Sequence, residues 1–427
     1  MERSRHAGYT QDSGYVDAVT DEKLAGAFRR WLWRPPRPHG EAIAGRTVSF
    51  LELFYDLVYV AVVSQAAHHL ADHVSLRGVG EFAVLFALIW IGWINGTLYL
   101  ELHGREDGRT RTLVFVQMGV LVVLAVYTAE AAARDGRGFA IAYATFQALL
   151  TWLWYVVHRE DRRDHPAFLT STRLYVTGIG VSAAVVFASA FLTGGPRLVV
   201  WACVTIAWIG GIAALGHPAV GLSRGLRPTE SLVERFGTFT IIVLGEVVFG
   251  VVDGLSASER DVKTITTGIV ALVIGFGFWW IYFDLVGRRP PRHEDGALAS
   301  WLLSHLPITL SITAAGAAMV SLISHAHDGR TPSNTAWLLA GAVALGLLAL
   351  IFTTRSLADA ERLAVVYRPM NVAIAVGAGA SVVVGWVRPA PWLFALLLVA
   401  ILSLLWFFAV SRFLRAGAWG DEPSHPR

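Results

Sequence analysis

Apolar runs of roughly 20 residues follow one another along nearly all of the chain after Arg46, with short polar segments between them. A helix of that length crosses the hydrocarbon core of a bilayer, which is about 30 Å thick. The separating segments contain turn formers such as Gly194-Gly195-Pro196 and Arg388-Pro389. The pattern predicts twelve membrane-spanning helices, at residues 48–70, 81–102, 112–133, 138–158, 173–193, 198–216, 234–253, 265–286, 300–324, 335–353, 369–387 and 391–412.

Composition supports the same fold class, an all-α polytopic membrane protein. Of the 427 residues 55% are hydrophobic and only 16% are charged, whereas a soluble domain carries about 25% charged residues. The sequence pI near 9.1 comes from arginines in short loops, so we expect the lipid bilayer as a partner and no nucleic acid. The single cysteine, Cys203, excludes an intrachain disulfide and a thiolate metal cluster.

The arginines also indicate direction. If both termini are cytoplasmic, 27 of the 35 lysine and arginine residues fall in the cytoplasmic segments and 8 on the other side. Short loops rich in positive charge remain in the cytoplasm. We therefore predict an even number of helices with the N- and C-termini in the cytoplasm.

The chain divides into four parts. We predict a mostly disordered cytoplasmic tail at 1–46 with an aromatic and basic interfacial anchor, a six-helix half at 47–216, a second half at 217–412, and a cytoplasmic tail at 413–427. Sliding the sequence by 182 residues places Glu52 over Glu234 and Phe54 over Phe236. The expectation is two parallel six-helix repeats, as in several secondary transporters. Chance similarity between helices is the alternative.

Ionisable residues inside spans are the candidates for function, because each is costly in a bilayer. Glu52 and Asp56 stand four apart and share a helix face. Residue counting places Glu234, Asp284 and His305 at a similar depth, and Glu246 about 18 Å deeper than Glu234. We expect them to converge on one site, where crowded carboxylates bind a proton or cation. The proton- or cation-binding set is Glu52, Asp56, Glu234, Glu246, Asp284 and His305, with Arg235, Asn95, Gln117, Arg111 and Gln65 as supporting polar residues.

Structural roles compete with this hypothesis. Glu234 and Glu101 could be solvated at the interface, and Asp56 and Glu246 could make structural hydrogen bonds between helices. The His305 ring could cap carbonyls freed by Pro307. Three histidines close the first span, but a solvated helix end explains them better than a metal site. No metal site is predicted, and the sequence identifies no cofactor either way. No phosphate loop, nucleophile elbow or His-Glu-x-x-His motif occurs.

A set of segments resembles a known family: Phe50-Leu51-Glu52-Leu53-Phe54-Tyr55-Asp56-Leu57-Val58-Tyr59-Val60 with Gln65, Trp93-Ile94-Asn95, Arg111 with Gln117-Met118, Glu234-Arg235-Phe236-Gly237 to Leu244-Gly245-Glu246, Trp279-Trp280-Ile281-Tyr282-Phe283-Asp284, and His305-Leu306-Pro307 with Gly316. On these residues the chain resembles the bacterial low-temperature-requirement A family of membrane proteins. The resemblance implies a bacterial inner (cytoplasmic) membrane protein and the same site residues. It implies no reaction, since the family is named after a growth requirement. Gln147 stands where the family is expected to carry an arginine, which puts an ionic partner at that position in question.

Three functions compete. A secondary transporter or ion pathway would use the carboxylate and histidine cluster to bind a proton or cation and couple it to a small solute. A membrane-embedded enzyme would act on a lipid or lipid-linked substrate with the same groups as acid, base or metal ligands. A structural or sensory membrane protein linked to growth at low temperature would have no turnover. The intramembrane acids and the expected repeat favour the first, and the sequence identifies no substrate and no oligomeric state.

Overall fold

The computed structural model describes residues 24, 26, 28, 31, 35–39, 41, 46–105, 107–215 and 229–417. Most of the expected N-terminal tail, the link between the halves and the end of the C-terminal tail therefore lie outside the described residues. The described part folds into long helices with one short 3-10 turn. They are α2 (Phe50–Asp72), α3 (Leu76–His103), α4 (Gly108–Thr128), α5 (Gly136–Asp164), η1 (Pro166–Phe168), α6 (Leu169–Ser189), α7 (Gly195–Leu215), α8 (Glu230–Ser256), α9 (Val262–Leu285), α10 (Asp295–Ser324), α11 (Ser333–Ser356), α12 (Ala364–Val387) and α13 (Pro391–Arg415).

The twelve predicted spans are confirmed, since twelve helices within the described residues are long and apolar enough to cross a membrane. The boundaries differ where a helix continues past its apolar stretch. α5 runs to Asp164 rather than ending at residue 158, because its last turns are polar but still helical. α10 continues through Pro307, so this proline does not end the helix.

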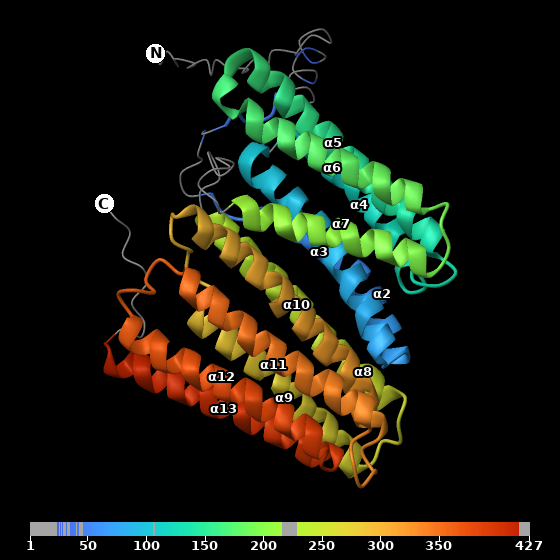
Figure 1. Cartoon of the computed structure of the whole chain (residues 1–427), viewed down its shortest axis with the longest axis vertical. Helices are drawn as coiled ribbons and strands as arrows, with labels where there is room; N and C mark the ends of the chain where they lie inside the picture. The colour runs from blue at the N-terminus through green and yellow to red at the C-terminus, as the bar shows by residue number, and fades with distance from the viewer. Residues whose placement is uncertain are drawn as a thin grey trace, which may run out of the picture.

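The helices lie side by side as tilted rods in a single slab (Figure 1). The first half, α2 to α7, occupies one side of the slab, and the second half, α8 to α13, the other. α3 and α10 are the most buried spans of the described chain. They form the centre, where α10 packs against α2, α3 and α7 of the first half, and α8 packs against α2.

Most pairs of neighbouring helices in one half have a counterpart in the other. In the first half α2 contacts α3 and α4, α5 lies between α4 and α6, and α7 contacts α3 and α6. In the second half α8 contacts α9 and α10, α11 lies between α10 and α12, and α13 contacts α9 and α12. The halves therefore share one internal order of packing.

Small residues bring α8 and α10 into backbone contact. A Cβ atom on Gly316 would overlap the carbonyl of Glu246, and one on Gly250 would overlap the carbonyl of Gly316. Close approach of this kind is how helices associate inside a membrane. It fixes the position of α8, and with it the side chains that face α2 and α3.

Candidate ion-binding site

The start of α2 positions the first acidic residue. Ser49 and Glu52 form a capping box, in which the Ser49 hydroxyl accepts a hydrogen bond from the Glu52 backbone N–H and the Glu52 carboxylate accepts one from the Ser49 N–H at 3.0 Å. A Ser-x-x-Glu pattern before an apolar run is the sequence signature of such a helix start. The capping box holds the Glu52 carboxylate at the end of the bundle where α2 begins and α3 ends, here called the N-terminal end.

Arg235 of α8 joins the two acids of α2. Its Nη1 lies 3.2 Å from Glu52 Oε1 and its Nη2 lies 3.1 Å from Asp56 Oδ1. Both partners of the second pair are fully enclosed, with side-chain exposures of 1% for Arg235 and 0% for Asp56. Spacing of four residues on α2 is what allows one guanidinium group to reach both carboxylates. The expected proximity of Glu52 and Asp56 to Arg235 is therefore present in the structure.

A second arginine approaches from the segment before α2. Arg46 lies 2.6 Å from Glu52 and also pairs with Glu101 at the end of α3. Glu101 accepts hydrogen bonds from the hydroxyl groups of Thr229 and Ser231 at the start of α8, at 2.7 and 2.8 Å. Residues from α2, α3, α8 and the preceding segment thus meet at one place.

These five side chains form what we call the carboxylate cluster: Glu52, Asp56, Glu101, Arg46 and Arg235. It holds three carboxylates and two guanidinium groups, and when all are ionised its net charge is one negative. Asp56 Oδ2 is buried and has no hydrogen-bond partner within the described chain. A third buried guanidinium, that of Arg37, donates to the backbone carbonyls of Glu101 and Leu102 beside the cluster, so the ionised groups balance. The unpartnered oxygen of Asp56 is therefore the place in the cluster where a proton or cation can bind.

An aromatic layer closes the cluster on its inner side. The Trp93 indole donates a hydrogen bond from Nε1 to Asp56 Oδ1 at 2.8 Å. The same ring stacks on Phe239, with centroids 4.0 Å apart, and meets Phe236 edge to face. Trp93 therefore links the charge state of Asp56 to the packing of α3 against α8.

Glu246 lies apart from the cluster. It is eleven residues after Arg235 on α8, a rise of about 16 Å. The residue is 3% exposed, and Ser64 of α2 hydrogen-bonds to it. Its Oε1 atom has no partner within the described residues. Glu246 is thus a separate buried acid beyond the aromatic layer.

Three other predicted site residues do not join the cluster through any contact in the structure. Glu234 is exposed, and its carboxylate accepts a hydrogen bond from the Val48 N–H at 3.1 Å. Asp284 accepts a hydrogen bond from Trp406 of α13 at 2.6 Å, which places it on the face of α9 that packs against α13. The shared depth of these residues did not bring them to one site, which corrects the expectation of a single convergence.

His305 is buried in an aromatic environment. Its Nδ1 lies 2.7 Å from the carbonyl of Trp301, which can only accept, so Nδ1 carries the hydrogen. Its Nε2 then accepts from the Tyr282 hydroxyl at 3.0 Å. The ring packs against Phe236, one residue from Arg235. Both ring nitrogens are satisfied, which is consistent with a structural role. The carbonyl that the ring contacts is that of Trp301, however, and not that of Leu303, the one freed by Pro307.

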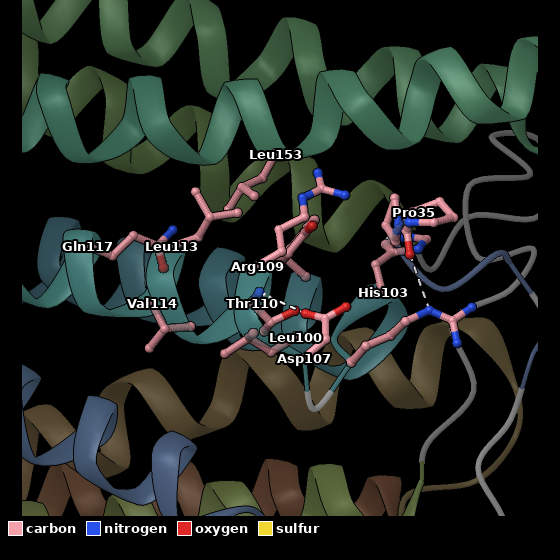
Figure 2. Close-up of a pocket in the computed structure, with 13 residues that line it drawn as sticks. Pro35, Leu100, His103, Asp107, Arg109, Thr110, Leu113, Val114, Gln117 and Leu153 are labelled. Atoms are coloured by element: carbon pink, nitrogen blue, oxygen red, sulfur yellow. Dashed lines mark hydrogen bonds between the residues drawn. The ribbon is translucent and has the colours of Figure 1, made fainter. Parts of the chain in front are cut away.

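The supporting polar residues are dispersed. Asn95 is buried but donates to the carbonyl of Ile91 on its own helix at 2.9 Å, Gln65 is half-buried, and Arg111 is exposed. Gln117 lines a narrow pocket between α3, α4 and α5, covered by Pro35 (Figure 2). The pocket offers about 10 Å³, room for roughly one water molecule. It cannot hold a solute in this conformation.

Among the described residues, no three histidine, cysteine or acidic side chains gather as a metal site would require. His69 instead lies 3.4 Å from Glu81, which Arg77 also contacts at 2.8 Å. His68 lies 3.4 Å from Asp253. The histidines that close α2 therefore pair with single acids at the end of the bundle opposite the N-terminal end.

Sequence reasoning missed three contributors. Arg46 counted only as a charge of the N-terminal tail, Glu101 as a residue of the interface, and Trp93 as part of a segment that resembles the family, with no role at the site. The role of Arg46 could have been predicted from the sequence, because this arginine lies just before the capping box of Ser49 and Glu52. The contacts of Glu101 and Trp93 depend on how α3 packs, which the sequence pattern does not give.

These features define a polytopic α-helical membrane protein with a buried ionic cluster between its two halves. The family model described as bacterial low temperature requirement A protein (LtrA) matches residues 47–408, and the chain belongs to this family. The chain is also similar to an uncharacterised protein of Rhizobium meliloti (strain 1021), with 32% identity over 328 residues, 70% of this chain and 74% of that protein.

Proposed function

We propose that the protein is a secondary transporter or ion pathway in which the carboxylate cluster binds a proton or cation and couples it to the movement of a small solute. The observation that carries the proposal is a fully enclosed carboxylate oxygen without a partner. The Asp56 side chain is 0% exposed, and its Oδ2 has no hydrogen-bond partner within the described chain. An additional positive charge would complete the site, and a proton on Asp56 is the smallest one.

The place of the cluster supports a role in transport. Glu52, Asp56 and Glu101 belong to the first half, whereas Arg235 and Ser231 belong to the second. Charged groups that join two halves hold them together on one side of the membrane. Changing the charge of Asp56 changes how strongly the halves are held, which is the coupling that alternating access requires.

The two halves are proposed to be parallel repeats. The matched pairs of neighbouring helices in α2 to α7 and in α8 to α13 support this, as does the alignment of Glu52 with Glu234. The arginine distribution supports an orientation with the N-terminal end of the bundle in the cytoplasm and the protein in the bacterial inner membrane.

The proposal is tested by proton and cation binding to the purified protein. Asp56→Asn keeps the size and part of the hydrogen bonding of the side chain but removes its titration. We expect this variant to lose one bound proton or cation per chain, measured by indicator dyes after a pH jump and by sodium and potassium titration. Glu234→Gln is the matched control, because that carboxylate is exposed at the same end and should bind normally.

Function in cells is the second readout. Asp56→Asn and Glu246→Gln should abolish complementation of a growth defect although both purified variants fold. A purely structural role predicts that complementation follows the amount of folded protein: Asp56→Asn lowers stability because Arg235 keeps only one buried acidic partner, whereas Glu246→Gln is neutral or stabilising because it removes a buried acid that has no ion pair in the described chain. Normal binding and normal complementation in both variants would refute the proposal.

A further inference from the structure

Three tyrosine hydroxyl groups lie along one face of α3 at intervals of one helical turn. A Cβ atom on Gly96 would lie 2.6 Å from the Tyr55 hydroxyl, and one on Gly92 would lie 3.4 Å from the Tyr59 hydroxyl. The third hydroxyl, that of Tyr143, donates to the carbonyl of Leu88 at 2.8 Å. Positions 96, 92 and 88 are four residues apart, so each step is about 6 Å along the axis of α3.

This series, which we call the tyrosine ladder (Tyr55, Tyr59 and Tyr143), begins at the carboxylate cluster. Tyr55 is adjacent to Asp56 in sequence, and its ring lies 5.9 Å from the Arg235 guanidinium carbon. The rings of Tyr55 and Tyr59 meet edge to face, with centroids 5.2 Å apart. From Gly96 to Leu88 the ladder covers about 12 Å of membrane depth.

The ladder is buried, and its hydrogen bonding is incomplete. All three rings are at most 1% exposed. Within the described residues the hydroxyl groups of Tyr55 and Tyr59 have no hydrogen-bond partner, and neither does the side-chain carbonyl of Gln147. Gln147 donates to the Tyr143 hydroxyl at 3.0 Å. Buried polar groups are normally hydrogen-bonded, and the Tyr55 and Tyr59 hydroxyl groups lie close enough to interact with each other.

Glycine at 92 and 96 is what makes the column possible. Any larger residue at Gly96 would occupy the position of the Tyr55 hydroxyl, and at Gly92 a Cβ would also meet Phe146 at 3.3 Å. The hydroxyl groups fill these notches. A phenol hydroxyl both donates and accepts a hydrogen bond, so a proton can pass along a series of them.

We propose that the tyrosine ladder conducts protons between the middle of the membrane and Asp56, and that the coupling ion of this protein is therefore the proton. Each phenol oxygen accepts a hydrogen on one side and releases its own on the other, so no bond between heavy atoms changes. Tyr143 can do so after its hydroxyl hydrogen turns away from the carbonyl of Leu88, to which it donates in the structure. Asp56 Oδ2 is the final acceptor. The inference rests on the proposed function, because it supplies the ion for the same cluster.

The ladder stops short of the opposite end. Between Leu88 and Glu81 the intervening residues of α3 are apolar over about 10 Å. This stretch separates the ladder from the paired His69 and Glu81. The structure is thus closed on that side, and opening there would connect the ladder to solution.

Proton uptake in proteoliposomes tests the ladder. The chains are oriented with the end opposite the N-terminal end facing the external buffer, an external pH jump is applied, and a dye follows the proton. The difference between the wild type and Asp56→Asn isolates the proton of Asp56. Tyr59→Phe and Tyr143→Phe should slow that uptake by about a hundredfold, the lower end of what a positioned proton-transfer group contributes.

The final amount of proton bound should be unchanged in both variants, which separates a conducting role from loss of fold. Tyr155→Phe is the control, because Tyr155 on α5 is 51% exposed and lies outside the column. Wild-type rates in both ladder variants, with uptake still lost in Asp56→Asn, would overturn the ladder and leave the proposed function standing. No difference between the wild type and Asp56→Asn would overturn the proposed function and the ladder together.

Discussion

Replacing Arg235 by glutamine is the sharpest test of the carboxylate cluster. The wild-type cluster contains three carboxylates and two guanidinium groups, and Arg235→Gln leaves three carboxylates with one. Asp56 then has no cationic partner within the described residues while remaining fully buried. Removing one member of a buried ion pair costs about 3–5 kcal/mol, because the remaining charge is neither solvated nor paired.

A matched control exists elsewhere in the chain. Arg292 lies 3.2 Å from Glu361, the same distance as Arg235 from Glu52, but the two side chains of this control pair are 30% and 86% exposed. Exposed pairs contribute at most about 1 kcal/mol. Equal geometry with unequal burial therefore predicts a clear difference between Arg235→Gln and Arg292→Gln in the free energy of unfolding.

Equilibrium unfolding of the purified protein in mixed micelles measures both variants. The double variant Arg235→Gln with Asp56→Asn removes one charge of each sign and restores the net charge of the wild type, so it should recover a large part of the lost stability. The reasoning is refuted if Arg235→Gln costs no more than Arg292→Gln, or if adding Asp56→Asn brings no recovery.

Two further predictions concern topology and packing. In a cysteine-free background, a cysteine at position 162 should react with an impermeant reagent only from the cytoplasmic side, and one at position 137 only from outside. The reason is that most arginines lie in the segments predicted to be cytoplasmic. Labelling of both cysteines from one side would exclude the proposed orientation. Gly316→Ala should destabilise the protein by about 1–3 kcal/mol, since its Cβ would overlap the backbone of α8. Gly341→Ala, where nothing lies within 4 Å, should be neutral or stabilising by up to about 1 kcal/mol, and similar unfolding energies for the two variants would contradict the close packing of α8 on α10.

The fold was predictable because the membrane imposes it. A run of apolar residues long enough to cross the bilayer has to be a helix, so the positions of α2 to α13 follow from hydrophobic length alone. The errors lie at the ends. α5 extends past its apolar stretch. Residues outside the hydrocarbon core do not have to be helical, so the end of the helix there depends on local helix preference.

The site was predictable only in part, because the sequence gives the depth of a side chain in the membrane but not the neighbouring helix that it faces. Counting residues gives the depth of a side chain in the membrane, and by depth Asp284 belongs with Asp56. Rotation of the helix about its axis decides which neighbour the side chain meets, and Asp284 meets Trp406 on α13. For Glu52 and Asp56 the four-residue spacing gave both the difference in depth and the shared helix face, and one arginine reaches both carboxylates.

Stability alone gives no reason for five ionisable groups between the halves. Within the second half α8 and α10 meet through Gly250 and Gly316 without any charged group, and across the boundary α3 meets α8 through the stacked rings of Trp93 and Phe239. Such packing associates helices without the cost of removing charges from water. Well-packed apolar side chains in place of a buried ionic network are often equally or more stable. The carboxylate cluster is therefore better explained by what its charge can do. Asp56 Oδ2 can take up a proton, and the bonds of the cluster join the two halves at one end only. Protonation of Asp56 would weaken that connection while the aromatic stack of Trp93 on Phe239 remains in place.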